Sequence, residues 1–263
     1  MRKVIFAVLT VVALGVFLFS GWQLWRIFDE YHTGEKLYET TAGKYVTPAP
    51  EKGQTPAAPG NQDSPEADSP AAATASPILV DFDALTQANA DVVAWLCCPD
   101  TLINYPVVQA ADNDTYLHRL LDGTENSTGT IFLDFRNSGD FSDRNSILYG
   151  HNMKNNTMFG TLPEYKDQAF YDAHPVMWLL TPEQTYRVDL VAGVVVDTES
   201  ELYTFWLDSL ELEERLDWAV SRSTFRSGVA VSEVERVLVL STCSYEFENA
   251  RYVLLGSLVP VED

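Results

Sequence analysis

Cys243 has the setting of a reactive cysteine in this chain of 263 residues. It follows the apolar run Val237–Leu240 and the two residues Ser241 and Thr242, and polar residues come after it. A cysteine at a strand end lies at the rim of a sheet, where a thiol can meet a substrate. Arg251 opens the next predicted strand, and antiparallel pairing would bring it beside Cys243. Its guanidinium could then favour the thiolate or donate hydrogen bonds to an oxyanion. The alternative is a buried cysteine with only a packing role.

His151 occupies a similar position on another predicted strand. It follows the run Ile147–Gly150 and opens a polar loop, so its imidazole is exposed enough to exchange protons. A cysteine and a histidine from distant segments, both at strand ends, form the pattern of a cysteine nucleophile with its acid/base partner. With Arg251 the set would comprise a thiolate, an acid/base and a charge stabiliser. The alternative for His151 is an ordinary loop histidine.

The remaining histidines and cysteines have weaker settings. We expect His118 on the surface of a helix, His174 in a turn and His32 in a polar stretch. Cys97 and Cys98 are adjacent in a strand, so they point to opposite faces, and we expect one to be buried and the other partly exposed. Because a disulfide between neighbours is strained, both should be free thiols. Metal-ligand spacings and a phosphate-binding glycine loop are absent from the sequence, so we expect no metal and no cofactor.

The sequence of residues 78–263, which contain these candidates, predicts a mainly β fold. Its strands are short, rich in branched and aromatic residues, and separated by Gly, Asn, Asp and Pro. Eight strands with few helices predict a closed barrel, which leaves no exposed edge. The predicted strands are Val92–Cys97, Ile103–Val108, Gly129–Asp134, Ser146–Gly150, Val176–Leu180, Tyr186–Val196, Glu235–Thr242 and Arg251–Pro260. The predicted peripheral helices are Phe82–Asn89, Asn113–Leu121 and an amphipathic helix at Leu207–Ser221.

An N-terminal transmembrane helix precedes this segment. Arg2 and Lys3 are followed by an apolar run, and Trp22 and Trp25 suit the membrane interface. A helix from Val4 to Trp25 would span about 33 Å at 1.5 Å per residue, enough for a bilayer core. The basic pair predicts an N-terminus inside the cell, with the rest of the chain outside. A cleaved signal peptide is the alternative, but no cleavage site with small residues follows the run.

Composition divides the chain into three parts. We expect a cytoplasmic tip and anchor at 1–28, an extracellular linker at 29–77 and a catalytic domain at 78–263. Asp29–Lys44 is ambiguous within the linker, since a short helix could continue there from the membrane segment. The linker holds seven of the 13 prolines and is rich in Ala, Ser, Thr and Gly, so it should be an extended tether. The net charge of −21 argues against nucleic acid as a partner. Three cysteines cannot form a disulfide framework.

Several motifs together resemble the sortases, membrane-anchored cysteine transpeptidases of Gram-positive bacteria, and most of all their class B. The most specific are the segment Tyr149–Lys154 with Met158–Leu162 downstream, and Leu240–Cys243 with Arg251. Segments Val93–Leu96 and Ile103–Gln109 also resemble the first two strands of that family. The resemblance covers the whole of the predicted domain.

This resemblance implies an eight-stranded sortase barrel with a few peripheral helices, of which the predicted helix Leu207–Ser221 would be the additional helix of class B. It implies that Cys243 is the nucleophile, His151 the acid/base and Arg251 the stabiliser of the oxyanion or the substrate carbonyl. Four further residues match positions that line the substrate groove: Asn113, Leu117, Tyr149 and Ser241.

The implied reaction is acyl transfer through a thioacyl enzyme. A C-terminal sorting motif of a secreted protein would be cleaved and joined to an amine of peptidoglycan or its precursor. The enzyme would be a single-pass protein of the cell membrane with its catalytic domain outside. Two alternatives stay open. A cysteine peptidase would use water as the acceptor, and a catalytically silent module would only bind.

Overall fold

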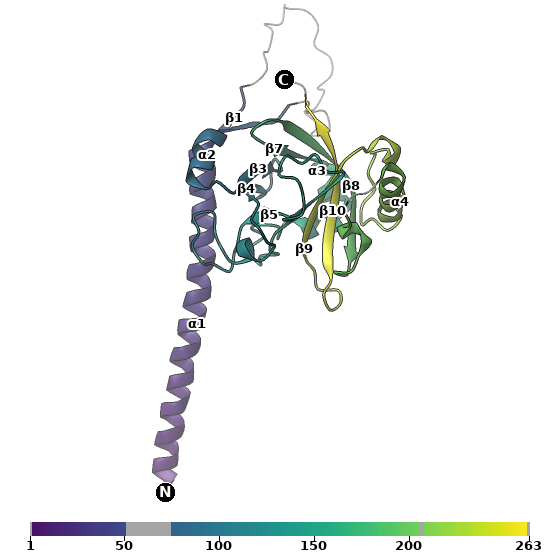
Figure 1. Ribbon diagram of the computed structural model, residues 1–263. Helices are drawn as coiled ribbons and strands as arrows, with labels where there is room; N and C mark the ends of the chain where they lie inside the picture. The colour runs from purple at the N-terminus through teal and green to yellow at the C-terminus, as the bar shows by residue number, and fades with distance from the viewer. Residues whose placement is uncertain (1, 51–74, 206–207, 262–263) are drawn as a thin grey trace, which may run out of the picture.

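Eight strands close into one barrel in the computed structural model, which describes residues 2–50, 75–205 and 208–261 (Figure 1). The strand order around the barrel is β10-β8-β7-β3-β4-β5-β6-β9. All eight match expected strands to within two residues at either end, so the predicted barrel is confirmed. The strands are β3 (Val92–Cys97), β4 (Asn104–Val108), β5 (Ile131–Leu133), β6 (Asn145–Tyr149), β7 (Val176–Leu180), β8 (Thr185–Val196), β9 (Val237–Cys243) and β10 (Arg251–Pro260).

The pairing of β6, β9 and β10 brings distant residues to one rim. Strands β6 and β9 are parallel, with Tyr149 opposite Ser241. Parallel strands end at the same edge of a sheet, so the residues that follow β6 lie beside those that end β9. Strand β10 returns antiparallel to β9 and sets Arg251 directly opposite Cys243. The expected juxtaposition of these two residues is therefore confirmed.

Helix α4 explains why β9 is apolar on both faces. Leu238 and Leu240 belong to the cluster that fills the barrel, whereas Val237 and Val239 belong to a second cluster under α4 (Ser209–Val220). Side chains alternate between the two faces of a strand. The alternation therefore turns Ser241 and Cys243 outward, at the end of the strand beyond the part that α4 covers.

The other helices are short, apart from the first. They are α1 (Arg2–Tyr45), α2 (Phe82–Ala88), α3 (Gln168–Ala173) and the 3-10 turns η2 (Thr115–Leu117), η3 (Leu162–Lys166), η4 (Glu201–Tyr203) and η5 (Val231–Glu233). Helix α4 begins with a reciprocal cap, in which Asp208 accepts from the Glu211 amide and Glu211 accepts from the Asp208 amide. Residue 207, where the expected helix began, lies outside the described residues.

The expected helix at Asn113–Leu121 is wrong, because only the turn η2 forms there. The Tyr116 carbonyl accepts a hydrogen bond from the Thr130 amide at 3.0 Å, and the His118 carbonyl accepts one from Asn126 at 2.9 Å. Carbonyls that a helix would pair internally are therefore paired with the following loop. Packing against that loop overrides the local apolar spacing.

Helix α1 extends well past the expected end at Trp25. Within its residues Leu9–Tyr45 the helix contains a stretch that is long and apolar enough to cross a membrane. After the helix, β1 (Val46–Pro48) pairs antiparallel with β2 (Ile78–Val80). Residues 29–48, assigned to a linker from composition, are thus helix and paired strand. Most of the proline-rich segment, 51–74, lies outside the described residues.

Cys97 and Cys98 are both buried, with exposed fractions of 5% and 2%. The expectation that one of them is partly exposed is wrong, because the outer face of β3 is covered. The Cys98 sulfur lies 3.4 Å from the Tyr165 hydroxyl of η3. Both are free thiols, and burial raises the pKa of each. This setting favours packing over reactivity.

Gly150 is the residue that allows β6 to end close against β9. Its amide donates to the Ser241 carbonyl at 3.2 Å, and its carbonyl accepts from the Thr242 hydroxyl at 2.8 Å. A Cβ at this position would collide with Ile131 and would lie 2.8 Å from the Phe159 ring.

We therefore expect Gly150→Ala to destabilise the fold by about 1–3 kcal/mol, the usual cost of overpacking. Urea unfolding of the detergent-solubilised chain measures the effect. Gly228→Ala is the matched control, since a Cβ there meets no atom within 4 Å. Equal stability of the two variants would contradict this account of Gly150.

Candidate active site

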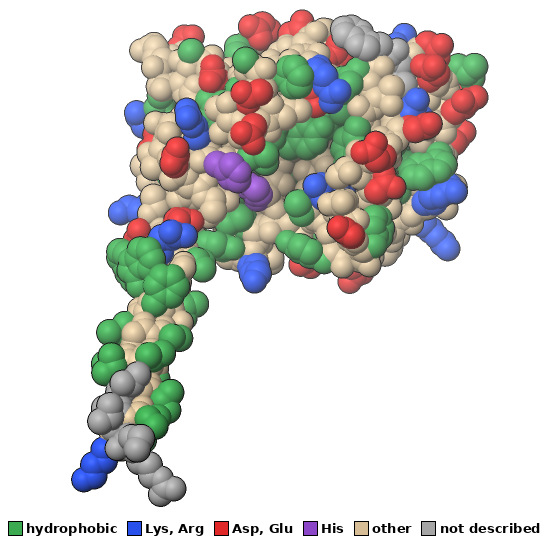
Figure 2. Space-filling view, turned by 60° about the horizontal axis from the view of Figure 1, so that its bottom comes forward, with side chains coloured by type: hydrophobic (Ala, Val, Ile, Leu, Met, Phe, Trp, Pro, Cys, Tyr) green, Lys and Arg blue, Asp and Glu red, His purple; other side chains and the backbone are tan. Residues whose placement is uncertain are grey.

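A pocket of about 370 Å³ opens beside the rim where β6 and β9 end. Figure 2 shows this face of the molecule, with histidine side chains at the edge of a hollow. The pocket is lined by Asn113, Leu117, Phe132, Arg136, Tyr149, Gly150, His151, Thr198, Tyr203, Ser241, Thr242, Cys243 and Arg251. All seven residues that the sequence nominated are among them.

Strand alternation brings three of these residues to the same outward face. Cys243 shares its face of β9 with Val239, and Arg251 shares its face of β10 with Val253, both of which pack under α4. His151 continues the face of β6 that carries Ile147. The three side chains come from neighbouring strands, and each is half-buried. They are shielded enough to be positioned and open enough to reach a ligand.

His151 is oriented by a backbone carbonyl. Its Nε2 lies 2.7 Å from the Leu117 carbonyl oxygen. A carbonyl only accepts, so Nε2 carries the hydrogen of this bond and Nδ1 remains to take or give a proton. The His118 ring stacks on the His151 ring at 6.2 Å, a neighbour that the sequence did not indicate. The next residue, Asn152, donates from its amide to the Cys243 carbonyl at 2.8 Å and ties the two strand ends together.

Arg251 has its charge available at the pocket. Its guanidinium donates to the Ala250 carbonyl at 3.0 Å. Among the described residues, no carboxylate forms an ion pair with it. A guanidinium without a carboxylate partner can direct its remaining donors to a ligand oxygen.

The walls of the pocket are aromatic and polar. The Tyr203 hydroxyl lies 2.8 Å from the Ser241 hydroxyl, and its ring stacks on Tyr149 at 6.4 Å. Leu117 adds an apolar surface beside His151. Such a mixture of apolar surface with a few fixed polar groups suits an extended peptide, whose backbone needs hydrogen bonds while its side chains need contact area.

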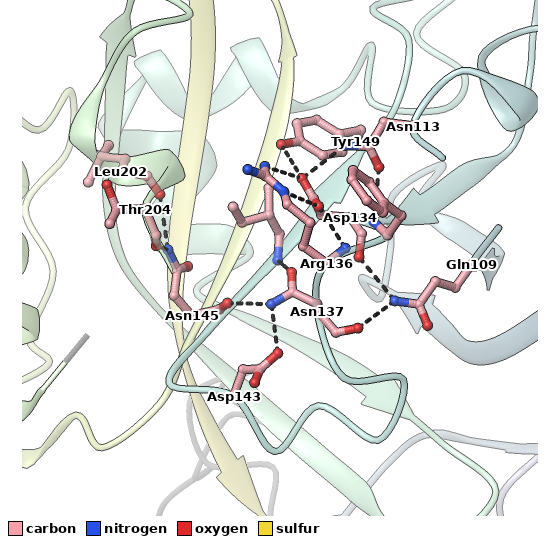
Figure 3. Close-up of polar contacts among 12 residues, drawn as sticks. Gln109, Asn113, Asp134, Arg136, Asn137, Asp143, Asn145, Tyr149, Leu202 and Thr204 are labelled. Carbon is pink, nitrogen blue, oxygen red and sulfur yellow. Dashed lines mark hydrogen bonds and ion pairs between the residues drawn. The ribbon is translucent and has the colours of Figure 1, made fainter. Parts of the chain in front are cut away.

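Asp134 is the buried residue that organises one wall (Figure 3). Its fully buried carboxylate accepts hydrogen bonds from Arg136 at 2.8 and 2.9 Å, from Asn113 at 2.9 Å and from the Tyr149 hydroxyl at 3.0 Å. Burial alone would raise the pKa of this carboxyl, but the bonds from Arg136 and Asn113 outweigh it and lower the pKa. Burial and the Asp134 charge raise the pKa of Tyr149, so that phenol stays protonated.

Asn145 fixes the opposite wall in the same view. Its amide donates to the Leu202 carbonyl at 3.1 Å and to the Thr204 carbonyl at 2.7 Å, which flank Tyr203 (Figure 3). The Asn145 backbone carbonyl in turn accepts from the Asn137 amide at 2.8 Å. The η4 segment is therefore anchored to the base of β6, which sets the position of Tyr203.

Asp134, Arg136, Asn145 and Tyr203 were missed by sequence reasoning. Each stands in a loop or at a strand end, without a motif or a periodic pattern around it. Asp134 and Asn145 are recognisable only by their burial. Tyr203 is recognisable only because its loop folds back over Ser241.

A larger cavity of about 740 Å³ lies between α4 and η4, away from Cys243 and His151. Its charged lining is mainly acidic and includes no cysteine or histidine, so we place the candidate site in the smaller pocket. Within the described parts of the chain, no group of three or more His, Cys, Asp or Glu side chains is arranged to hold a metal ion.

We expect Asp134→Asn to lower the free energy of unfolding at pH 7 by about 1–3 kcal/mol, because it weakens a buried charged hydrogen-bond set. The lowered pKa of Asp134 means that its carboxylate stabilises the fold above the unfolded pKa of about 3.9. That stability is lost as the pH falls through the folded pKa. Urea unfolding at pH 7 and pH 3 should thus show a smaller deficit at pH 3. The exposed Asp172→Asn is the control, and a deficit independent of pH would contradict the assignment.

Comparisons with known proteins match this chain to the sortases. The sequence profile of the sortase domain matches residues 96–259. Sortase B of Listeria monocytogenes is 35% identical over 256 residues, which cover 95% of both chains. Sortase B of Staphylococcus aureus is 31% identical over 183 residues, which cover 68% of this chain and 75% of the other.

Solved structures agree with the sequences. Sortase B from B. anthracis in complex with AAEK1 superposes with a TM-score of 0.70 at 28% identity, covering 89% of this chain and all of the other. A Staphylococcus aureus sortase B–substrate complex gives a TM-score of 0.64 at 29% identity, covering 69% and 85%. Since the profile spans more than half of the chain and one relative matches along almost its whole length, the chain belongs to the sortase family of cysteine transpeptidases and is most like its class B members.

Proposed function

We propose that Cys243 is the nucleophile of this transpeptidase, that His151 exchanges the proton and that Arg251 stabilises the oxyanion. The observation that carries the proposal is the convergence of the three on one outward rim, from three neighbouring strands. A thiolate, an acid/base and a fixed positive charge are the groups that acyl transfer requires.

The proposed acyl transfer takes place in two steps. The Cys243 thiol passes its proton to Nδ1 of His151, and its sulfur attacks the carbonyl carbon of a peptide bond. The guanidinium of Arg251 donates hydrogen bonds to the oxygen that becomes negative. The C–N bond then breaks, His151 gives its proton to the leaving amine, and a thioester remains. In the second step an incoming amine attacks the thioester, His151 takes a proton from it, and the C–S bond breaks. An amide forms and the thiolate is regenerated.

The acyl donor of this reaction is, in our proposal, the C-terminal sorting motif of a secreted protein. Asn113, Leu117, Tyr149 and Ser241 line the groove, together with Tyr203. The similar Staphylococcus aureus sortase B has been solved as a substrate complex, and a similar sortase B has been solved in complex with triglycine. An amine of peptidoglycan or its precursor is the corresponding acceptor, and the product is a protein anchored to the cell wall.

We place this enzyme at the cell membrane as a single-pass protein of a Gram-positive surface. The support is the apolar part of α1, whose side chains are exposed, with Arg2 and Lys3 before it and Trp22 and Trp25 near its end. Basic residues on the N-terminal side favour an inside N-terminus, which puts the barrel outside. Secreted proteins and wall precursors both reach that side of the membrane.

The full-length enzyme in detergent, a panel of sorting-motif peptides and an amine acceptor test the reaction. We expect an amide product by mass spectrometry and a loss of about 10³-fold or more in Cys243→Ala, because the nucleophile is gone. Cys97→Ala, which alters a buried cysteine outside the pocket, is the matched control. Hydrolysis that no amine diverts would favour a cysteine peptidase, and a panel without turnover or thioacyl adduct would favour a silent binding module.

Arg251→Lys tests the stabilising role. Lysine keeps the charge but not the planar fork of donors, so we expect kcat to fall about 10–100-fold while KM changes little. Arg222→Lys, at an exposed position just after α4, is the control. Steady-state kinetics with one peptide measure both constants, and a loss confined to KM would assign Arg251 to ground-state binding instead.

A further inference from the structure

Helix α1 is docked along the catalytic domain after it leaves its apolar part. Its buried residues Gly34, Tyr38, Thr41 and Tyr45 recur every three or four positions, so they form a single stripe on the helix. The Tyr38 hydroxyl donates to the Gly129 carbonyl at 2.6 Å, and its ring meets Tyr105 edge-on at 5.4 Å. Helix and barrel are therefore one packed unit.

Gly34 makes the close approach possible. A Cβ at this position would lie 2.7 Å from the Thr128 hydroxyl oxygen, too near for any larger residue without displacement. One turn earlier, Glu30 accepts hydrogen bonds from Asn126 at 3.0 Å and from Ser127 at 2.7 Å. The contact thus begins at Glu30, near the end of the membrane-facing part of the helix.

Little chain separates the proposed membrane span from the docked part. Phe28 is still 70% exposed, whereas Glu30 already contacts the domain. The helix rises only about 8 Å from Trp25, at the expected membrane interface, to Glu30. This is close to the thickness of one headgroup layer. Because this connection is short and helical, it would keep the catalytic domain at the bilayer surface. A flexible tether would not.

The catalytic pocket opens on the same side. Gly129, whose carbonyl Tyr38 contacts, lies against the backbone of the pocket-lining residue Leu117, since a Cβ on Gly129 would be 2.8 Å from the Leu117 carbonyl oxygen. In Figure 1 the β9–β10 loop points toward the N-terminal end of α1, and Figure 2 shows the hollow on the face turned to that side. In that loop Tyr245 is 80% exposed, and an ion pair between Lys166 and the next residue, Glu246, holds the loop in place.

We propose that the docked α1 holds the mouth of the catalytic pocket against the bilayer, with Tyr245 at the lipid interface, so that the enzyme acts on peptides and amines presented at headgroup level. Tyrosine is enriched at this depth because its ring is apolar and its hydroxyl is hydrated. The inference rests on the proposed membrane placement of α1. Beyond that placement, it identifies the face of the domain that contacts the lipid and the docked helix as the cause.

Depth-dependent quenching tests the orientation without using activity. The full-length Cys243→Ala protein is reconstituted in phosphatidylcholine vesicles containing a headgroup-labelled quencher lipid. A fluorophore is attached at Tyr245→Cys or at Leu79→Cys, an exposed site on β2 at the other end of the domain. We expect at least threefold stronger quenching at 245 than at 79. Equal quenching at both sites would overturn the proposal.

Undocking the helix should abolish that difference. Gly34→Leu introduces a side chain against Thr128, whereas Gly43→Leu, on the same helix, meets no atom within 4 Å and is the matched control. If Gly34→Leu fails to fold, a flexible Gly-Ser insertion between Phe28 and Asp29 separates the domain from the membrane and leaves the docked stripe intact. Quenching that persists at 245 in the insertion protein would contradict rigid placement.

Turnover then separates this inference from the proposed reaction. The peptide that the wild-type enzyme cleaves is supplied either in solution or on a short lipid anchor in the same vesicles. We expect Gly34→Leu to lower kcat/KM for the anchored peptide at least fivefold and to leave the soluble peptide unchanged, because only effective concentration is lost. Equal losses on both peptides would overturn the inference. A wild-type enzyme that cleaves neither peptide would contradict the proposed function, while quenching would still decide the orientation.

Discussion

The parallel pairing of β6 with β9 is the constraint on which the site depends. It places the carboxyl ends of two strands that are far apart in sequence at one rim, and the antiparallel return of β10 adds Arg251 there. Strand alternation then selects the face, since Cys243, His151 and Arg251 all continue rows that pack under α4. A one-residue slip of β9 would turn the thiol toward the barrel interior. The strand register that packs the hydrophobic core therefore also orients the three candidate catalytic side chains.

Two buried polar residues supply what the strands cannot. Part of the pocket wall is formed by segments outside the strands, such as those that carry Asn113, Arg136 and Tyr203. Such segments are more mobile than strands unless other contacts hold them. Asp134 gathers three side chains of one wall around a single carboxylate, and Asn145 holds the carbonyls on both sides of Tyr203. Burying such groups is costly unless they are hydrogen-bonded, so the bonds that Asp134 accepts and the two that the Asn145 amide donates strongly favour one arrangement of each wall. These hydrogen bonds therefore fix the positions of pocket residues that lie outside the strands.

The docked helix changes how the enzyme would meet its substrates. A free tether would let a catalytic domain sample a large volume, at a low effective concentration for any target in the membrane. A helix packed through Gly34 and Tyr38 gives up that reach and, in the proposed placement, would fix one face toward the bilayer. Both partners of the proposed reaction, a protein leaving the membrane and a wall precursor, are to be found there. The fixed orientation of the domain, and not the reach of a flexible tether, would bring the pocket to these substrates.

The sequence by itself determined the eight strands, because each is a short apolar run between turn residues, and it determined the motifs around His151 and Cys243, because they are local. It also indicated the N-terminal span from continuous hydropathy. Only the tertiary structure decided the rest. The helix expected at Asn113–Leu121 gave way to a turn because its carbonyls bond to the loop that follows. The residues after the span became a docked helix because Gly34 fits against Thr128. Asp134 and Asn145 gained their roles from burial, a property set by the whole fold and written in no single segment.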